Sequence, residues 1–375
     1  MTGLAALAVA MGIGRFAFTP ILPMMQDDSA LTMAQAGWLA SANYAGYLAG
    51  ALTAGVRLRA EIAIRMGLLT IGVATLAMGL TQHFPAWLAL RFVAGVASAW
   101  VLVFVSSWAL ERLAVLGRPG LGGVVYAGVG SGIVIAGGAC LVVIELNGGS
   151  RGAWLALGVL SICATAAIWT LVAGGLSSSP SPHTASDFRG PEYWRLVLCY
   201  GAFGFGYIIP ATFLPAMAKE IVADPRLFGW AWPAFGAAAV VSTLYAARLT
   251  ARLSHRSAWI GGHLVMALGL IVPLVVPGLA GIVAAALLVG GTFMVITMSG
   301  MQEARRAGGP HARALMAAMT SAFALGQILG PVTVSLLPQG LSPALMLAAS
   351  ILALSALLLL TSAGRPESAP GSARE

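Results

Sequence analysis

Long apolar runs separated by short polar breaks dominate the sequence from one end to the other. An α-helix needs about 20 apolar residues to cross roughly 30 Å of hydrocarbon, and each run has about that length. The breaks predict twelve spans, at residues 3–25, 33–55, 65–82, 85–110, 121–145, 152–174, 193–217, 227–247, 257–276, 278–301, 312–336 and 342–362. We therefore expect an all-α membrane protein with twelve transmembrane helices.

The composition excludes a soluble fold of this size. Of the 375 residues, 59% are hydrophobic and only 9% are charged, whereas a soluble domain has about 25% charged residues. The net charge of +8 is spread over many short loops and forms no basic stripe with interleaved aromatic residues, so we expect no nucleic-acid partner. The expected partners are the lipid bilayer and a small-molecule substrate.

The distribution of basic residues predicts the topology, because cytoplasmic loops carry an excess of Lys and Arg. With the N-terminus inside, the outer loops hold only Arg151, Lys219 and Arg226. The inner segments hold Arg57, Arg59, Arg65, Arg112, Arg118, Arg189, Arg195, Arg248, Arg252, Arg256, Arg305, Arg306, Arg313, Arg365 and Arg374. This asymmetry predicts a multi-pass protein of a bacterial-type inner (plasma) membrane with both termini cytoplasmic.

The chain repeats itself at an offset of 192 residues, including at uncommon residue types. The matched pairs include Gly12/Gly204, Gly14/Gly206, Pro23/Pro215, Met25/Met217, Trp38/Trp230, Pro85/Pro277 and Glu111/Glu303. We predict two pseudo-symmetric six-helix bundles at residues 1–175 and 193–363, a Ser- and Pro-rich cytoplasmic linker at 176–192 and a disordered tail at 364–375. Such a parallel repeat is typical of carriers that expose a central site to each side in turn. A monomer is expected.

Two segments resemble a known family. The run GIGRFAFTPILPMM (Gly12–Met25), followed by AGWLASANYAGYLAG (Ala36–Gly50), is similar to the YbfB/YjiJ-like group of the major facilitator superfamily. The wider superfamily resemblance covers the whole chain, and RFVAGVASA (Arg91–Ala99) resembles its Arg-x-x-x-Gly motif. The resemblance implies the major facilitator fold and a transport role, but no substrate.

The family's usual charge gate is only partly present. Ala54–Gly55 and Ala251 stand near the places where the family has an acid in the loops after spans 2 and 8. Glu111 and Glu303, at the inner ends of spans 4 and 10, are the alternative partners that we expect for the loop arginines, which are Arg57, Arg59, Arg252 and Arg256. The run Gly128–Gly138 resembles the family's antiporter motif but lacks its proline.

Arg15 is the most informative residue. It lies about 12 residues into the first span, so a rise of about 1.5 Å per residue places it about 18 Å deep, near the midplane. A charge at this depth is costly and usually faces a cavity or a partner. The guanidinium can bind a carboxylate through two hydrogen bonds, so we predict that Arg15 anchors an anionic group. The alternative is a structural tie to backbone carbonyls.

Other polar residues fall at membrane depth. Those predicted to line the pathway are Asn43, Tyr44, Tyr47, Tyr126, Tyr207 and Gln327, although such groups more often bond neighbouring helices. Tyr207 is the best of them, because it matches Arg15 under the repeat offset. Two residues are candidates for a proton relay, His263 and Arg91; the alternatives are a buried structural histidine and an arginine that reaches to the surface.

These features predict a secondary active transporter that works by alternating access. No Asp or Glu falls at mid-membrane depth, so an electropositive cavity is expected to favour a small organic anion such as a carboxylate. The alternatives are an exporter of amphipathic drugs or metabolites, and a non-transporting sensor on the same fold. An enzyme is not expected, because the five histidines are scattered and only His263 is intramembrane. Neither a metal nor a cofactor is expected.

Overall fold

A computed structural model describes residues 1–54, 59–118, 121–172, 190–222, 224–308, 311–337 and 341–361, and these residues form helices joined by short turns. In chain order the helices are α1 (Thr2–Leu7), the π-helix η1 (Ala8–Ile13), α2 (Phe18–Ser29), α3 (Met33–Thr53), α4 (Ala60–Met78), α5 (Phe84–Val115), α6 (Gly122–Glu145), α7 (Ser150–Ile168), α8 (Pro191–Ile221), α9 (Pro225–Phe228), α10 (Ala231–Arg252), α11 (His255–Val275), α12 (Leu279–Gly308), α13 (Ala312–Leu336) and α14 (Leu341–Leu360). The all-helical prediction is confirmed.

Within the described ranges, eleven helical segments are long and apolar enough to cross a membrane. The remaining predicted span is α3, which is 21 residues long, or about 31 Å, but carries polar residues such as Gln35 and Asn43. The position of α3 explains this composition, because it packs between α5 and α13. A helix held between two others needs less apolar surface than one that faces lipid on most sides.

The observed boundaries differ from the predicted ones mainly at charged ends. Helix α5 continues to Val115 and α12 to Gly308, beyond the predicted limits of 110 and 301. Helix α8 begins at Pro191, inside the predicted linker. Proline suits the first turn of a helix, and the negative charge of Glu192 interacts favourably with the positive end of the helix dipole. Apart from Gly190, the rest of the predicted linker, 176–189, lies outside the described residues, and so does the predicted tail at 364–375.

The pattern of helix contacts repeats between the two halves of the chain. In the first half, α3 packs on α5, α4 on α5 and α7, and α6 on η1. In the second half, α10 packs on α12, α11 on α12 and α14, and α13 on α8. These are corresponding helices under the 192-residue offset, so the predicted pseudo-symmetry is confirmed at the level of helix packing.

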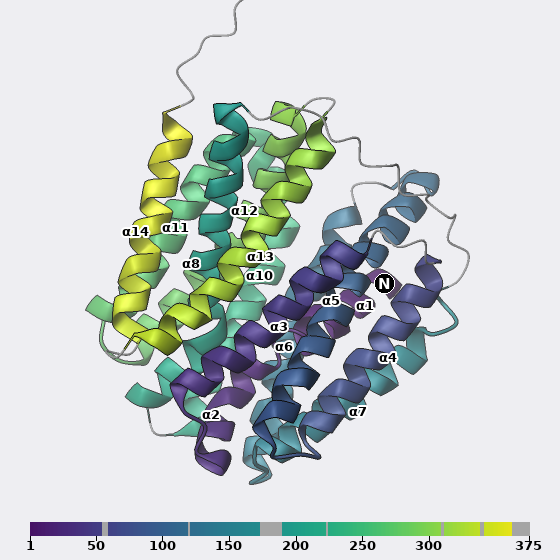
Figure 1. The fold of residues 1–375 in the computed structure, drawn as a ribbon, viewed down its shortest axis with the longest axis vertical. Coiled ribbons are helices and arrows are strands. Elements are labelled where there is room, and N and C mark those ends of the chain that lie inside the picture. Colours follow the sequence, from purple (N-terminus) through teal and green to yellow (C-terminus); the bar gives the residue numbers. More distant parts are fainter. Residues whose placement is uncertain are drawn as a thin grey trace, which may run out of the picture.

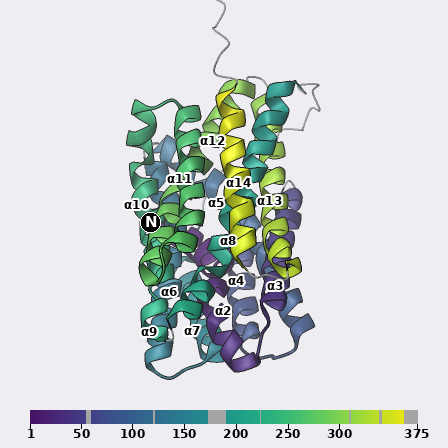
Figure 2. The ribbon, with the colours of Figure 1, turned by 90° about the vertical axis from the view of Figure 1, so that its left-hand side faces the viewer.

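Among the described helices, the main contacts between the halves are those of α3 with α13, α6 with α10 and α9, and α2 with α8. In Figure 1 the two sets of helices converge near α2 and separate toward the opposite end. That opposite end, which we call the basic end, carries Arg59, Arg65, Arg112, Arg195, Arg256, Arg305 and Arg306. The other end, the far end, holds the end of α2, the start of α7, and α9 (Figure 2).

Glycines allow the closest helix contacts. A Cβ on Gly132 of α6 would lie 2.3 Å from the carbonyl oxygen of Ala8, and one on Gly12 would lie 2.3 Å from the backbone of Gly132. In the second half the corresponding position is Gly204, where an added Cβ would lie 2.2 Å from the carbonyl oxygen of Phe323. Close backbone approach of this kind is how helices associate in lipid, where water provides no hydrophobic drive between them.

This packing gives a one-carbon test. Gly132→Ala should lower the midpoint of thermal unfolding in detergent by about 5 °C or more, because the added methyl group meets a carbonyl that cannot move aside. The matched control is Gly138→Ala on the same helix, where an added Cβ meets no described heavy atom within 4 Å. Since alanine is the better helix former, this control should be neutral or stabilising. Equal midpoints for the two variants would contradict the proposed packing.

Candidate substrate-binding site

The first membrane span is broken at the position of Arg15. The π-helix η1 gives way to a turn at residues 14–17, and α2 then begins at Phe18. Two backbone hydrogen bonds here span five residues, as in a π-helix. The Gly14 N–H donates to the Val9 carbonyl at 2.9 Å, and the Phe16 N–H donates to the Met11 carbonyl at 3.0 Å. Breaks of this kind free backbone carbonyls and often occur at functional sites.

Two buried side chains bond to the carbonyls at the break. Arg91 on α5 donates from Nη2 to the Arg15 carbonyl at 3.2 Å, and Asn43 on α3 donates to the Gly14 carbonyl at 3.3 Å. Asn43 also donates to the Arg91 carbonyl, at 2.8 Å, which ties the three helices together. Neither side chain is among those that line the central cavity. These contacts support the broken helix. Asn43 was predicted to line the pathway and Arg91 to relay protons, but neither side chain reaches the cavity.

The guanidinium of Arg15 is buried, with 2% of the residue exposed. Its central carbon lies 4.1 Å from the ring centroid of Tyr47 and 5.2 Å from that of Tyr44, distances that permit cation–π attraction. Nη2 donates a hydrogen bond to the side-chain oxygen of Gln327, while Nε has no partner in the described structure. None of the ion pairs between described residues includes Arg15. Among the described residues, the cavity lining therefore holds one positive charge without a carboxylate counter-charge.

Gln327 connects Arg15 to Tyr207. Its amide nitrogen donates to the Tyr207 hydroxyl at 3.2 Å, and its amide oxygen accepts from Arg15. Arg15 belongs to the first half of the chain, whereas Gln327 lies on α13 and Tyr207 on α8 in the second half. The structure therefore brings together three of the predicted binding residues in a hydrogen-bonded chain that crosses between the halves.

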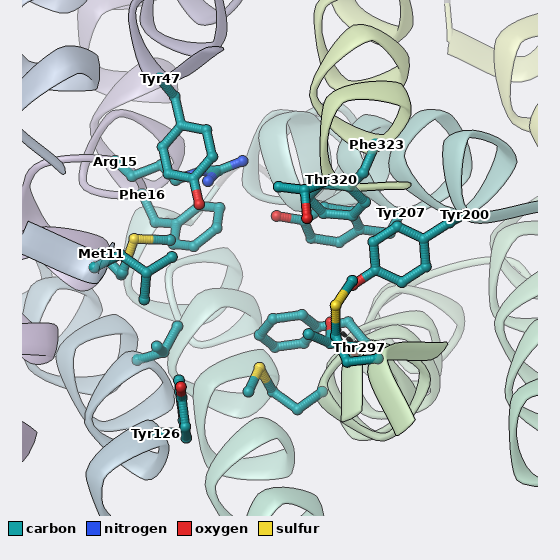
Figure 3. Close-up of a pocket in the computed structure, with 15 residues that line it drawn as sticks. Met11, Arg15, Phe16, Tyr47, Tyr126, Tyr200, Tyr207, Thr297, Thr320 and Phe323 are labelled. Carbon is teal, nitrogen blue, oxygen red and sulfur yellow. Dashed lines mark hydrogen bonds between the residues drawn. The ribbon is translucent and has the colours of Figure 1, made fainter. Parts of the chain in front are cut away.

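A cavity of about 190 Å³ lies beside this chain. Figure 3 shows Tyr47, Arg15, Phe16, Met11 and Tyr126 along one wall, facing side chains of the second half across the cavity. The other lining residues are Leu102, Val129, Tyr200, Tyr207, Phe293, Met294, Thr297, Met301, Thr320 and Phe323. Arg15 is the one charged residue in this lining, and most of the remaining surface is aromatic or aliphatic.

Aromatic stacking forms the wall of the second half. The ring of Tyr207 lies between Phe293, with centroids 5.5 Å apart, and Phe323, with centroids 5.7 Å apart. The interplanar angles are 8° and 10°, so the three rings are nearly parallel. This wall offers flat apolar faces next to one polar hydroxyl group, an arrangement suited to an apolar group with one polar end.

The cavity is closed on the side of the far end. The Thr19 hydroxyl donates to the Ala211 carbonyl at 2.7 Å, and the Tyr44 hydroxyl lies 3.0 Å from that of Thr212. Thr19 and Ala211 are 192 residues apart, so the bond joins matched positions of the repeat. From Arg15 the cavity extends toward the basic end, where its lining includes Tyr126 near the start of α6.

Two ion pairs join the halves at the far end. Lys219 pairs with Asp27 and also donates to the Pro23 carbonyl at 3.0 Å. Arg226 lies 3.1 Å from Glu145. In both pairs the carboxylate belongs to the first half and the cation to the second, so these contacts hold the far end together.

The predicted gate at the basic end is partly visible. Glu303 is buried at 4% exposure, and one of its oxygens lies 3.6 Å from Arg256, which follows the loop after α10. Arg256 also pairs with Glu192 at 2.9 Å, so this network stays within the second half. Arg57 and the side chain of Arg252 lie outside the described residues, Arg59 is exposed, and Glu111 is half-buried on α5. A gate between the halves at this end stays a prediction.

His263 is fully buried but is not among the residues that line the cavity. Its Nε2 accepts a hydrogen bond from the Trp259 indole at 2.9 Å, and its ring centroid lies 6.2 Å from that of Phe203. These contacts are those of a packed structural histidine. No contact of His263 with the described cavity lining supports the predicted role in a proton relay.

The sequence interpretation missed most of the apolar lining. Hydropathy does not distinguish a helix face that lines a cavity from one that contacts lipid. The lining residues Phe16, Phe293, Phe323 and Tyr200 lie in such apolar runs. One usable signal was available, because Tyr200, Phe203 and Tyr207 recur at helical spacing on α8. Tyr44 lies over the Arg15 guanidinium, and its hydroxyl contacts that of Thr212 across the halves.

Comparison with solved structures places this fold among known transporters. The nucleoside transporter NupG, in a mutant form, superposes with a TM-score of 0.74 at 13% identity, covering 96% of this chain and 98% of that chain. A bacterial homologue of the human lysosomal transporter Spinster, in an inward-facing and occupied conformation, gives a TM-score of 0.75 at 15% identity, covering 96% and 95%. At these identities the similarity concerns the fold alone.

Sequence comparison identifies the family. "Uncharacterized MFS-type transporter YceJ" of Bacillus subtilis (strain 168) is 27% identical over 275 residues, which are 68% of this chain and 67% of that protein. The model of the family described as "Uncharacterised MFS-type transporter YbfB" matches residues 7–360. The resemblance inferred from the first two spans is thereby confirmed, and the chain belongs to the YbfB family of MFS-type membrane transporters.

Proposed function

We propose that the protein is a secondary transporter of a small organic monoanion, a carboxylate attached to an apolar body. The observation that carries this proposal is the single charge in the cavity, the Arg15 guanidinium, which has no carboxylate partner among the described residues. A carboxylate forms two parallel hydrogen bonds with a guanidinium and would neutralise its charge. Because the cavity lining provides one cation, a solute with one negative charge should bind better than one with two.

The apolar lining supports the second part of the proposal. Phe16, Phe293 and Phe323 present aromatic faces to the cavity, and Met11, Met294 and Met301 add adaptable thioether side chains. A volume of about 190 Å³ suits a solute with roughly ten non-hydrogen atoms, such as an aromatic monocarboxylate. The same lining fits an exporter of amphipathic compounds, so the charge of the solute is the property that separates the two candidates.

The positive-inside rule indicates which end of the protein faces the cytoplasm. The basic end is assigned to the cytoplasm, so both termini are cytoplasmic and the membrane is the bacterial inner membrane. With this assignment, the structure is an inward-facing conformation, and we propose that the protein works as a monomer. Movement of one half against the other around the contacts of α3 with α13 and α6 with α10 would expose the site to the opposite side.

The described lining of the cavity contains no Asp or Glu, so proton coupling would use a group other than a carboxylate of the cavity wall. A monocarboxylic solute can itself carry the proton. The carboxyl group of the solute then binds Arg15 as the anion or carries the proton as the neutral acid, and these are successive states of one group.

The Arg15 assignment is tested by uptake into proteoliposomes. Benzoate, phenylacetate and acetate are compared with glucose and an amphipathic cation. Arg15→Lys should raise the KM for the best carboxylate at least about tenfold, because the two-bond geometry is lost, and Arg15→Met should abolish uptake. The matched control is Arg305→Lys, an exposed residue on α12, which should transport normally. Normal uptake by Arg15→Lys, or transport of the cation alone, would disprove the anion assignment.

The far-end ion pairs give a second prediction, on conformation. Asp27→Asn should shift the population toward the state that is open at the far end by about 1.5- to 5-fold, the modest effect expected for an exposed pair. The measurement is the pulsed EPR distance between spin labels on Leu146 and Leu227, two exposed residues at the far end on opposite halves. Glu220→Gln, next to Lys219 in sequence, is the control and should leave the distribution unchanged. An unchanged distribution in Asp27→Asn would exclude a role for this pair.

A further inference from the structure

Gln327 is fully buried, and its contacts determine how its amide is oriented. A guanidinium has only donors, so Arg15 must face the amide oxygen. The amide nitrogen then donates to the Tyr207 hydroxyl at 3.2 Å. Arg15 on one half of the protein is therefore bonded to an acceptor that the other half holds in a fixed orientation.

The atom that Gln327 occupies on Arg15 has a specific consequence. A carboxylate can bind a guanidinium through two bonds along the Nε–Nη2 edge or along the Nη1–Nη2 edge. Both edges include Nη2, which is the nitrogen that donates to Gln327. Nη2 carries two hydrogens, one directed along each edge, so a two-bond carboxylate replaces Gln327 where it binds along the edge that Gln327 faces. On the Nε–Nη2 edge, the carboxylate would also satisfy Nε, which has no acceptor in the described structure.

A secondary transporter that performs net transport must reorient without its solute in part of each cycle. During that step Arg15 passes through a closed arrangement in which both ends exclude bulk water. A buried guanidinium without an acceptor is costly, whereas one that keeps a hydrogen bond is much less so. The rings of Tyr47 and Tyr44 lower the cost further, but they lie over the face of the cation and leave its N–H groups unsatisfied.

We propose that Gln327 is an internal substitute for the substrate: its amide oxygen binds Arg15 when no carboxylate does, and so allows the empty carrier to reorient. The solute displaces Gln327 on binding, and Gln327 returns on release. This inference rests on the proposed function for the identity of the solute. The role of Gln327 in the empty carrier rests only on Arg15, Gln327 and Tyr207 and can be tested without any solute.

The first experiment measures reorientation of the empty protein. Ala211→Cys is introduced after Cys140, Cys163 and Cys199 are replaced by alanine. Ala211 is fully buried, and its carbonyl accepts the Thr19 bond between the halves, so a thiol there reacts with a bulky maleimide only when the far end opens. In nanodiscs without solute, Gln327→Met should slow labelling about tenfold or more, because methionine keeps the side-chain length but offers only a weak acceptor.

Two further variants separate this role from a merely structural one. Gln327→Glu keeps the acceptor and adds a permanent counter-charge, so empty-state labelling should stay within about twofold of the unsubstituted rate, while carboxylate uptake falls at least about tenfold. Ser321→Ala is the matched control on α13, because its hydroxyl bonds only the Ala317 carbonyl of its own helix, at 3.0 Å, among the described contacts. This control should change neither labelling nor uptake. Size-exclusion profiles and unfolding temperatures establish that each variant is folded.

The second experiment compares net efflux with exchange. Proteoliposomes are loaded with radiolabelled benzoate, or with the carboxylate of the panel that is carried best. Efflux is followed into buffer without solute and into buffer with the same unlabelled solute. Gln327→Met should slow net efflux about tenfold or more while exchange stays within about twofold, because the loaded carrier has its own acceptor for Arg15.

The outcomes distinguish the two proposals. Equal slowing of net efflux and exchange, or labelling of Gln327→Met at the unsubstituted rate, would overturn the role of Gln327. Failure of the unsubstituted protein to carry any carboxylate would overturn the proposed function. The labelling experiment would still decide whether Gln327 supports the empty carrier.

Discussion

A guanidinium buried in the middle of a membrane-spanning bundle must find hydrogen-bond acceptors and polarisable surfaces, and the surroundings of Arg15 meet that requirement. The helix that carries Arg15 is broken there, and Arg91 and Asn43 bond to the carbonyls at the break. Aromatic rings lie over the cation, and its hydrogen-bond acceptor comes from the other half of the chain. The central cavity is therefore organised around one positive charge.

The contacts between the halves leave that charge accessible from one side. At the far end, the Thr19–Ala211 bond and the Tyr44–Thr212 contact close the bundle directly beyond Arg15. Glycines let the backbones of the two halves approach closely elsewhere. Gly130 of α6 and Gly236 of α10 are each close enough that a Cβ would lie within 3 Å of the other's carbonyl oxygen. Contacts with few interlocking side chains are compatible with rocking of one half against the other.

Hydropathy alone predicted the spans, because the exclusion of charge from lipid acts on every membrane helix. The repeat at an offset of 192 residues predicted the pairing of helices and placed Tyr207 across from Arg15, and the structure confirms that both line one cavity. The break at residues 14–17 was not predicted, since an apolar run with two glycines has the same hydropathy whether it is a continuous helix or a π-helix with a turn. The supporting contacts of Arg91 and Asn43 depend on three helices meeting, which periodicity in one helix cannot reveal. The sequence predicted that Glu303 lies near arginines of the loop after span 8, and in the structure it lies 3.6 Å from Arg256, but its burial was not predicted.

The most direct test is a structure of the protein bound to the carboxylate that it carries best. The account predicts that one carboxylate oxygen lies about 2.7–2.9 Å from Arg15 Nη2, that the Gln327 oxygen has moved away from this nitrogen, and that the apolar part of the solute contacts Phe293 or Phe323. A bound solute that leaves the Arg15–Gln327 bond intact and places its charge elsewhere would contradict the account.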